Sequence, residues 1–282
     1  QYFIQQGFKD CRVFSNYGII LWDLGKLEEA EVSTRKAIEI KPNYAIAHSN
    51  LGSILRDIGK LKEAEVSTRK AIKIKPDYAD AHCNLGSILR DIGRLKEAEI
   101  STRKAIEIKP DYAIAHLNLG LILKDMGKLG EAEVFTRKAI EIKSDYAIAH
   151  SNLGNILRDS GKLGEAESSY RKALEIKPDY AIAHSNLGVI LKGIGNLKEA
   201  ELSYRKALEI KPDLADAYLN LGNVLNDLGK IKEAFDSYLK VIEINPRPYK
   251  IYNALTRFLK DSDLLQLNKL KLKNILNILI ER

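Results

Sequence analysis

The sequence predicts an all-α fold, a solenoid of antiparallel helix pairs, and two observations predict it. The first is a fixed period: glycine, alanine and proline recur every 34 residues along most of the 282-residue chain. The second is that each period holds two stretches with helical spacing of apolar residues, separated by a glycine and usually ended by a proline. Such self-similarity is typical of repeat proteins, in which each unit buries its apolar face by stacking on the next.

The period divides the chain into seven repeats: 11–44, 45–78, 79–112, 113–146, 147–180, 181–214 and 215–248. One glycine set falls inside the first helical stretch of each repeat, at Gly18, Gly52, Gly86, Gly120, Gly154, Gly188 and Gly222. A second set follows that stretch, at Gly25, Gly59, Gly93, Gly127, Gly161, Gly195 and Gly229. We interpret residues 1–10 as the end of a truncated preceding repeat and residues 249–282 as a degenerate capping helix pair.

The repeat 45–78 shows how the pattern becomes two helices. Its first stretch places apolar residues on one face, at spacings of four, three and four: Ala47, Leu51, Ile54 and Ile58. We expect Asn43 to cap this helix and Gly59 to end it, since glycine adopts a left-handed conformation without a Cβ penalty. The second stretch turns Ala64, Thr68 and Ala71 inward before Pro76. Its exposed face pairs Glu65 with Arg69 at the favourable i,i+4 spacing, and this pair recurs in five other repeats.

These residues resemble the tetratricopeptide repeat. The repeat supplies His48-x2-Leu51-Gly52-x2-Leu55, then Ala64-x3-Thr68, and finally Pro76. His, Leu and Thr replace the family's Trp, Tyr and Phe. These replacements change the volume of the packed side chains but not the pattern of two packed helices per repeat. The resemblance implies a right-handed superhelix whose first helices line a concave groove, and a binding scaffold rather than an enzyme. We further expect the chain to be a fragment of a longer bacterial protein.

One asparagine per repeat forms a ladder on the first helices, beside the buried stripe. Asparagine is a mediocre helix former, so seven copies need a reason. A carboxamide offers one acceptor and two donors, which match the N–H and C=O of a peptide. The ladder is similar to that in the repeat arm of O-linked N-acetylglucosamine transferases, and the resemblance implies that it binds substrate peptides. The alternative is that each amide bonds the backbone of a neighbouring repeat. The ladder residues are Asn16, Asn50, Asn84, Asn118, Asn152, Asn186 and Asn220.

Isoleucines stand four residues before the ladder (Ile46, Ile114, Ile148, Ile182). The remaining groove positions are polar, and we expect this mixed lining to favour an extended polar ligand. They comprise serines (Ser49, Ser53, Ser87, Ser151, Ser185), aspartates (Asp57, Asp91, Asp125, Asp159, Asp227) and cations (Arg56, Arg90, Lys124, Arg158, Lys192). In the first repeat, Trp22 stands at the position where the next five repeats carry a cation. We expect Trp22 to pack on the truncated upstream helix, with ligand stacking as the alternative.

No residue pattern indicates catalysis, a metal or a cofactor. The five histidines lie one repeat apart, roughly 10 Å, too far to share an ion, so we expect packed side chains: His48, His82, His116, His150 and His184. Cys11 and Cys83 form no disulfide framework and favour a reducing compartment. No apolar run approaches the roughly 18–20 residues of a membrane span, so we expect no membrane association and a cytoplasmic protein.

The leading hypothesis is a scaffold that binds extended protein or peptide segments in the concave groove. The alternative is the substrate-recruiting arm of a larger glycosyl-, sulfo- or methyltransferase whose catalytic domain is absent from the chain. The apolar segment 264–280 would then dock on that domain, or else mediate self-association. Nucleic acid is an unlikely partner: the net charge is +7, but basic and acidic residues alternate throughout.

Overall fold

The computed structural model describes residues 10–245, together with Leu255 and Phe258. The segments 1–9 and most of 249–282, which we interpreted as a truncated repeat and a cap, lie outside the described residues. The described part of the chain contains helices and turns and no strand, so the predicted all-α fold class is confirmed.

The described helices alternate between two sets, which we call first helices and second helices. The first helices are α2 (Cys11–Asp23), α4 (Ala45–Ile58), α6 (Ala79–Ile92), α8 (Ala113–Asp125), α10 (Ala147–Asp159), α12 (Ala181–Gly193) and α14 (Ala215–Asp227). The second helices are α3 (Leu27–Ile40), α5 (Leu61–Ile74), α7 (Leu95–Ile108), α9 (Leu129–Ile142), α11 (Leu163–Ile176), α13 (Leu197–Ile210) and α15 (Ile231–Ile244).

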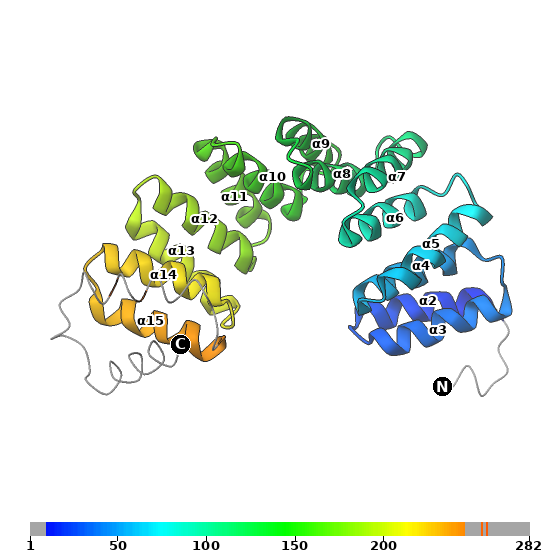
Figure 1. The fold of residues 1–282 in the computed structure, drawn as a ribbon, viewed down its shortest axis with the longest axis horizontal. Helices are drawn as coiled ribbons and strands as arrows, with labels where there is room; N and C mark the ends of the chain where they lie inside the picture. The colour runs from blue at the N-terminus through cyan, green and yellow to red at the C-terminus, as the bar shows by residue number, and fades with distance from the viewer. Residues whose placement is uncertain (1–9, 246–254, 256–257, 259–282) are drawn as a thin grey trace. The chain divides into compact units, whose positions relative to one another are not determined.

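The chain divides into two compact units, residues 1–144 and 145–282. The first unit contains α2 to α9 and the second contains α10 to α15. Within each unit, every first helix packs on the second helix that follows it, and that second helix packs on the next first helix (Figure 1). Each repeat therefore buries its apolar face against its own partner and its neighbour, as the period predicts.

Glycine ends the first helices as predicted, whereas the predicted asparagine cap is wrong. Gly59 has φ of 88°, in the left-handed region, and the next amide, Lys60 N–H, donates to the Leu55 carbonyl at 2.8 Å. This bond satisfies a carbonyl at the helix end. Asn43 does not cap α4. The turn before the helix closes through Tyr44 N–H on the Lys41 carbonyl, so Tyr44 takes the N-cap position and Asn43 stays exposed.

The glycines inside the first helices lie where two helices approach closely. A Cβ on Gly86 would lie 2.0 Å from Thr102 Oγ1 and 3.2 Å from the Ala98 carbonyl oxygen. A Cβ on Gly188 would instead meet the Tyr204 ring, at 2.8 Å from its Cζ atom. Threonine is the partner throughout the first unit and tyrosine throughout the second, so the two units differ in the packing at the centre of each helix pair.

Two residues beyond the seventh repeat are described, and both are buried. Leu255 lies 34 residues after the buried Leu221 and is itself completely shielded from solvent. Phe258 stacks on Phe235 with ring centroids 6.0 Å apart and meets Tyr238 edge-on at 5.4 Å. Phe235 and Tyr238 belong to α15, so Phe258 covers part of the stacking face of this last second helix.

Candidate functional site

The asparagine ladder lies on the first helices at the boundary between core and solvent. Asn16 is exposed, and the other six ladder residues are half-buried. Five of the seven follow a buried residue, as Asn50 follows Ser49. The asparagines therefore form a row along the edge of each unit's core, and their polar ends are positioned by the rigid helices below them.

Four ladder amides donate to the first helix of the preceding repeat. Asn50 Nδ2 donates to Ser15 Oγ at 3.2 Å, and Asn84 Nδ2 donates to Ser49 Oγ at 3.1 Å. Asn118 Nδ2 lies 2.9 Å from Ser87 Oγ and 3.2 Å from Cys83 Sγ. In the second unit, Asn186 Nδ2 donates to Asn155 Oδ1 at 3.2 Å. The ladder thus links neighbouring repeats through side chains, a variant of the structural alternative considered above.

These bonds use only part of each amide. A carboxamide has two N–H donors and one acceptor oxygen. In Asn50 and Asn84 the inter-repeat bond uses one donor. Neither carbonyl oxygen is among the buried unpartnered atoms of the described residues. The same side chain can therefore connect two repeats and still present hydrogen-bonding groups at the surface.

Two of the serines that we placed in the groove belong to the core. Ser49 is 1% exposed and Ser151 is 2% exposed, so neither lines a surface. Their neighbours Asn50 and Asn152 lie about 100° further around the helix. That rotation moves the side chain from the buried core to the half-buried edge of the helix pair. Ser53 and Ser87 are half-buried, and their hydroxyls donate to the carbonyls four residues earlier.

An apolar row that the sequence reasoning undervalued runs beside the asparagines. It lies four residues before them and consists of exposed isoleucines: Ile46 (42%), Ile114 (46%), Ile148 (47%) and Ile182 (51%). Asp80 and Asp216 occupy the same position in two other repeats. Each unit therefore offers aliphatic surface next to amide groups.

A third row, of ion pairs, connects successive first helices within each unit. Arg56 pairs with Asp91 and Arg90 pairs with Asp125, each one repeat further along the chain. Trp22 occupies the equivalent position in the first repeat, and its Nε1–H donates to Asp57 Oδ2 at 2.7 Å. The ring packs beside Leu21, Ala30 and Ile54. Trp22 therefore has a hydrogen-bond partner in the following repeat, while the upstream helix on which we expected it to pack belongs to residues 1–9, outside the described residues.

Four of the histidines are tied to the turn that precedes their helix: His48, His82, His116 and His184. His48 Nε2–H donates to the Pro42 carbonyl at 2.9 Å, and His82 repeats the contact with Pro76 at 2.8 Å. A carbonyl oxygen can only accept, so this bond fixes the proton on Nε2. No group of three potential ligands within the described residues is arranged for a metal ion.

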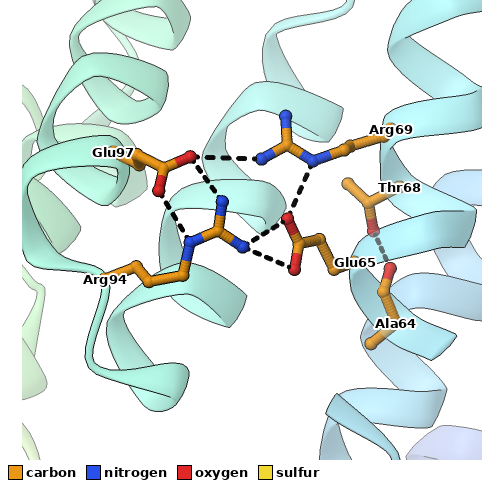
Figure 2. A network of polar contacts seen from close by, with 6 residues as sticks. All are labelled: Ala64, Glu65, Thr68, Arg69, Arg94 and Glu97. Atoms are coloured by element: carbon orange, nitrogen blue, oxygen red, sulfur yellow. Dashed lines mark hydrogen bonds and ion pairs between the residues drawn. The ribbon is translucent and has the colours of Figure 1, made fainter. Parts of the chain in front are cut away.

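The second helices carry a charge network that spans repeats. The predicted pair of Glu65 with Arg69 is confirmed, with Nε and Oε1 2.8 Å apart. Figure 2 shows that Arg94 of the next repeat also donates to Glu65 and that Glu97 bridges Arg94 and Arg69. Sequence reasoning found the pairs within a helix and missed those between helices, although the fixed spacings of 28 and 29 residues were visible in the sequence.

The repeated helix pairs define the class of this chain as an α-helical solenoid repeat protein. Family models of the tetratricopeptide repeat match residues 12–44, 52–93, 86–127, 111–179, 145–213 and 215–248. The chain therefore belongs to the tetratricopeptide repeat family. Members of this family bind proteins or peptides and are in general non-catalytic scaffolds.

Solved structures give the same fold. A chain of the APC/C hetero-tetramer Cut9–Hcn1 is similar with a TM-score of 0.77 at 15% identity, over 88% of this chain and 49% of that one. PilF of Pseudomonas aeruginosa has a TM-score of 0.64 at 20% identity, over 77% of this chain and 97% of its own. TTC0263 of Thermus thermophilus has a TM-score of 0.59 at 23% identity, over 64% and 98%.

These likenesses concern the fold. The match spans 49%, about half, of the length of the Cut9–Hcn1 chain. No curated protein sequence matches the chain. In the part of the chain that the structure describes, every helix is too short or too polar to cross a membrane.

Proposed function

We propose that the chain is a non-catalytic scaffold that binds extended peptide segments along its first helices, and that it does so in the cytoplasm. The observation that carries the proposal is the asparagine row with its unused amide groups beside the exposed isoleucines. An extended peptide presents N–H and C=O groups on its edges and side chains on its faces. Amides can bind the edges while Ile46 and Ile114 contact apolar side chains of the ligand.

The spacing of the repeats supports an extended ligand. Neighbouring helix pairs stack roughly 10 Å apart, about a helix diameter. An extended chain rises about 3.3 Å per residue, so every third ligand residue would meet an equivalent set of side chains. The main-chain contacts would be the same in each repeat, which suits partners of varied sequence.

The test is a binding measurement on a peptide array with a triple variant, Asn50→Ala, Asn84→Ala and Asn118→Ala, all within the first unit. We expect the variant to lose at least tenfold in affinity for peptides that bind the parent. The matched control is Ser15→Ala with Ser49→Ala, which removes the partners of two amides and keeps the amides themselves. If the triple variant binds as the parent does, the ladder is structural and the proposal fails. If the serine variant loses binding equally, the amides act by positioning the repeats.

A further inference from the structure

A second binding feature lies on the second helices, away from the asparagine row. In the first unit, a groove runs between successive second helices, with the intervening first helix as its floor. One groove, of about 610 Å³, lies between α3 and α5 over His48, Leu51 and Leu55 of α4. The next, of about 750 Å³, lies between α5 and α7 over His82, Leu85 and Leu89 of α6. We call these the second and third grooves, after the repeats that supply their floors.

The fourth repeat fills the equivalent place with a side chain of its own. Phe135 stands where Ser67 and Ser101 stand in the two repeats before it. Its ring stacks on His116, with centroids 6.0 Å apart and planes 25° from parallel. The Arg103 guanidinium carbon lies 5.2 Å from the centre of the same ring. Phe135 is thus held between an imidazole and a guanidinium, both of which favour an aromatic face.

Burial of the histidine shows what the phenylalanine covers. His116 is only 5% exposed, whereas His48 and His82 are half-buried in their open grooves. His116 Nδ1 is the single buried side-chain nitrogen or oxygen without a hydrogen-bond partner among the described residues. The ring of Phe135 therefore takes a place that solvent occupies over the other two imidazoles.

The two open grooves keep the groups that hold Phe135. Each has the histidine, fixed through its Nε2 on a proline carbonyl. Each also has the arginine, Arg35 in the second groove and Arg69 in the third. Glutamates bind the edges of these guanidinium groups: Glu65 accepts from Arg69 at 2.8 Å and Glu97 at 3.5 Å (Figure 2). A guanidinium bound at its edges still presents its face to a ring, as Arg103 does while it donates to Glu99 and Glu131.

Exposed aliphatic side chains complete the wall of each open groove. Val66 is 71% exposed beside the second groove and Ile100 is 70% exposed beside the third. Ser67 and Ser101 are small and 7% exposed, and their hydroxyls donate to the His48 and His82 carbonyls. A serine at this position leaves room for a ring that a phenylalanine would fill.

We propose that the second and third grooves each bind an aromatic side chain of a partner polypeptide, in the place that Phe135 takes in the fourth repeat. The partner segment carries two phenylalanine-like residues. In an extended segment they stand about three residues apart, since neighbouring grooves lie about a helix diameter from one another. This site is independent of the peptide site proposed on the first helices.

The test uses the full chain and a flexible glycine–serine peptide with two 4-fluorophenylalanines three residues apart, observed by fluorine NMR. We expect saturable binding with a shifted fluorine signal, and at least tenfold weaker binding by the matching peptide with leucine at both positions. The double variant Ser67→Phe with Ser101→Phe fills both grooves from within and should weaken binding at least tenfold. A chain with both grooves filled that still binds as the parent does would overturn the proposal, and so would equal binding of the leucine peptide.

Two further variants keep the outcome interpretable. Phe135→Ser opens one more groove and should raise the number of ring sites by one, independently of whether the double phenylalanine variant folds. An unchanged number of sites would contradict the proposal. The triple asparagine variant should bind the fluorinated peptide as the parent does, which separates this site from the function proposed above. Loss of binding in that variant would assign the rings to the first helices and overturn the groove assignment.

Discussion

At the scale of single residues, the closest approach in the first unit is between an interior glycine and the threonine of the facing helix. Thr102 Oγ1 is fixed by its hydrogen bond to the Ala98 carbonyl at 2.9 Å, so it cannot easily swing away from Gly86. A methyl group at Gly86 would also crowd the Ala98 carbonyl oxygen at 3.2 Å. The helix–helix distance in each pair therefore depends on the missing Cβ.

We expect Gly86→Ala to destabilise the chain. Overpacking costs typically about 1–3 kcal/mol, whereas alanine gains at most about 1 kcal/mol in helix propensity, so the net loss should be about 1–2 kcal/mol. The matched control is Gly130→Ala in α9, where an added Cβ meets nothing within 4 Å. Urea unfolding measures both. A stabilised Gly86→Ala variant would show that the helices separate at little cost.

The thiol of Cys83 should be unreactive in the folded chain. Burial raises the pKa of Cys83 to about 12, although the Asn118 amide bonds the sulfur and acts in the opposite direction. The thiolate is the reactive form, so very little of it exists at pH 8. We expect iodoacetamide to label Cys83 at least tenfold more slowly in native than in unfolded protein, as measured by mass spectrometry of the peptide. Equal rates would mean that the repeat opens readily around this residue.

At the scale of elements, the second helices are joined by glutamates that accept from two cations each. Glu99 accepts from Arg103 on its own helix at 2.8 Å and from Lys128 one repeat later at 3.2 Å. Its side chain is 15% exposed, so the carboxylate is largely shielded while its partners reach solvent. Pairs of this kind fix the spacing of neighbouring helices, and each is worth little by itself in water.

The charge network should make stability depend on pH. Hydrogen bonding from Arg103 lowers the pKa of Glu99, against the opposing effect of partial burial. A lowered folded-state pKa gives stability that is present above the unfolded pKa of about 4.3 and is lost as pH falls through the folded value. Glu99→Gln should therefore cost about 0.5–1 kcal/mol at pH 7 and less at pH 3.

Denaturant unfolding at the two pH values measures this difference. The control is Glu107→Gln, because the pair of Glu107 with Lys104 is solvent-exposed and lies within one helix. A Glu99→Gln penalty that persisted unchanged at pH 3 would show that packing, rather than charge, is responsible.

The sequence predicted what depends on local spacing and missed what depends on how repeats stack. Gly59 as a helix end and the Glu65–Arg69 pair follow from periodicity and propensity alone. The partner of Trp22 does not, since Asp57 reaches it only when two first helices lie side by side. Likewise, a rotation of one residue separates the buried Ser49 from the half-buried Asn50, which is finer than a hydrophobic pattern resolves. The role of the asparagine row in binding stays a prediction.

At the scale of the whole molecule, the two units coincide with a change in packing chemistry. Threonine contacts the interior glycine as far as Thr136, and tyrosine takes over from Tyr170. Tyr170 also donates its hydroxyl to Asn155 at 2.8 Å, a bond that threonine could not make across that distance. The described helices that pack most extensively on one another belong to the same or adjacent repeats, so stability is approximately a sum of local terms.

Local terms predict local consequences for dynamics. Gly86→Ala should lower hydrogen-exchange protection in the first unit and leave the second unit near its parent values. The reason is that the added Cβ crowds Thr102, which lies in the first unit, and none of the tyrosines that face the interior glycines of the second unit. Gly188→Ala should do the reverse, since its added Cβ would lie 2.8 Å from the buried Tyr204 ring. Hydrogen exchange followed by mass spectrometry resolves the repeats one by one. Equal loss of protection in both units from either variant would mean that the chain opens as a single cooperative structure, and that the change from threonine to tyrosine has no energetic consequence.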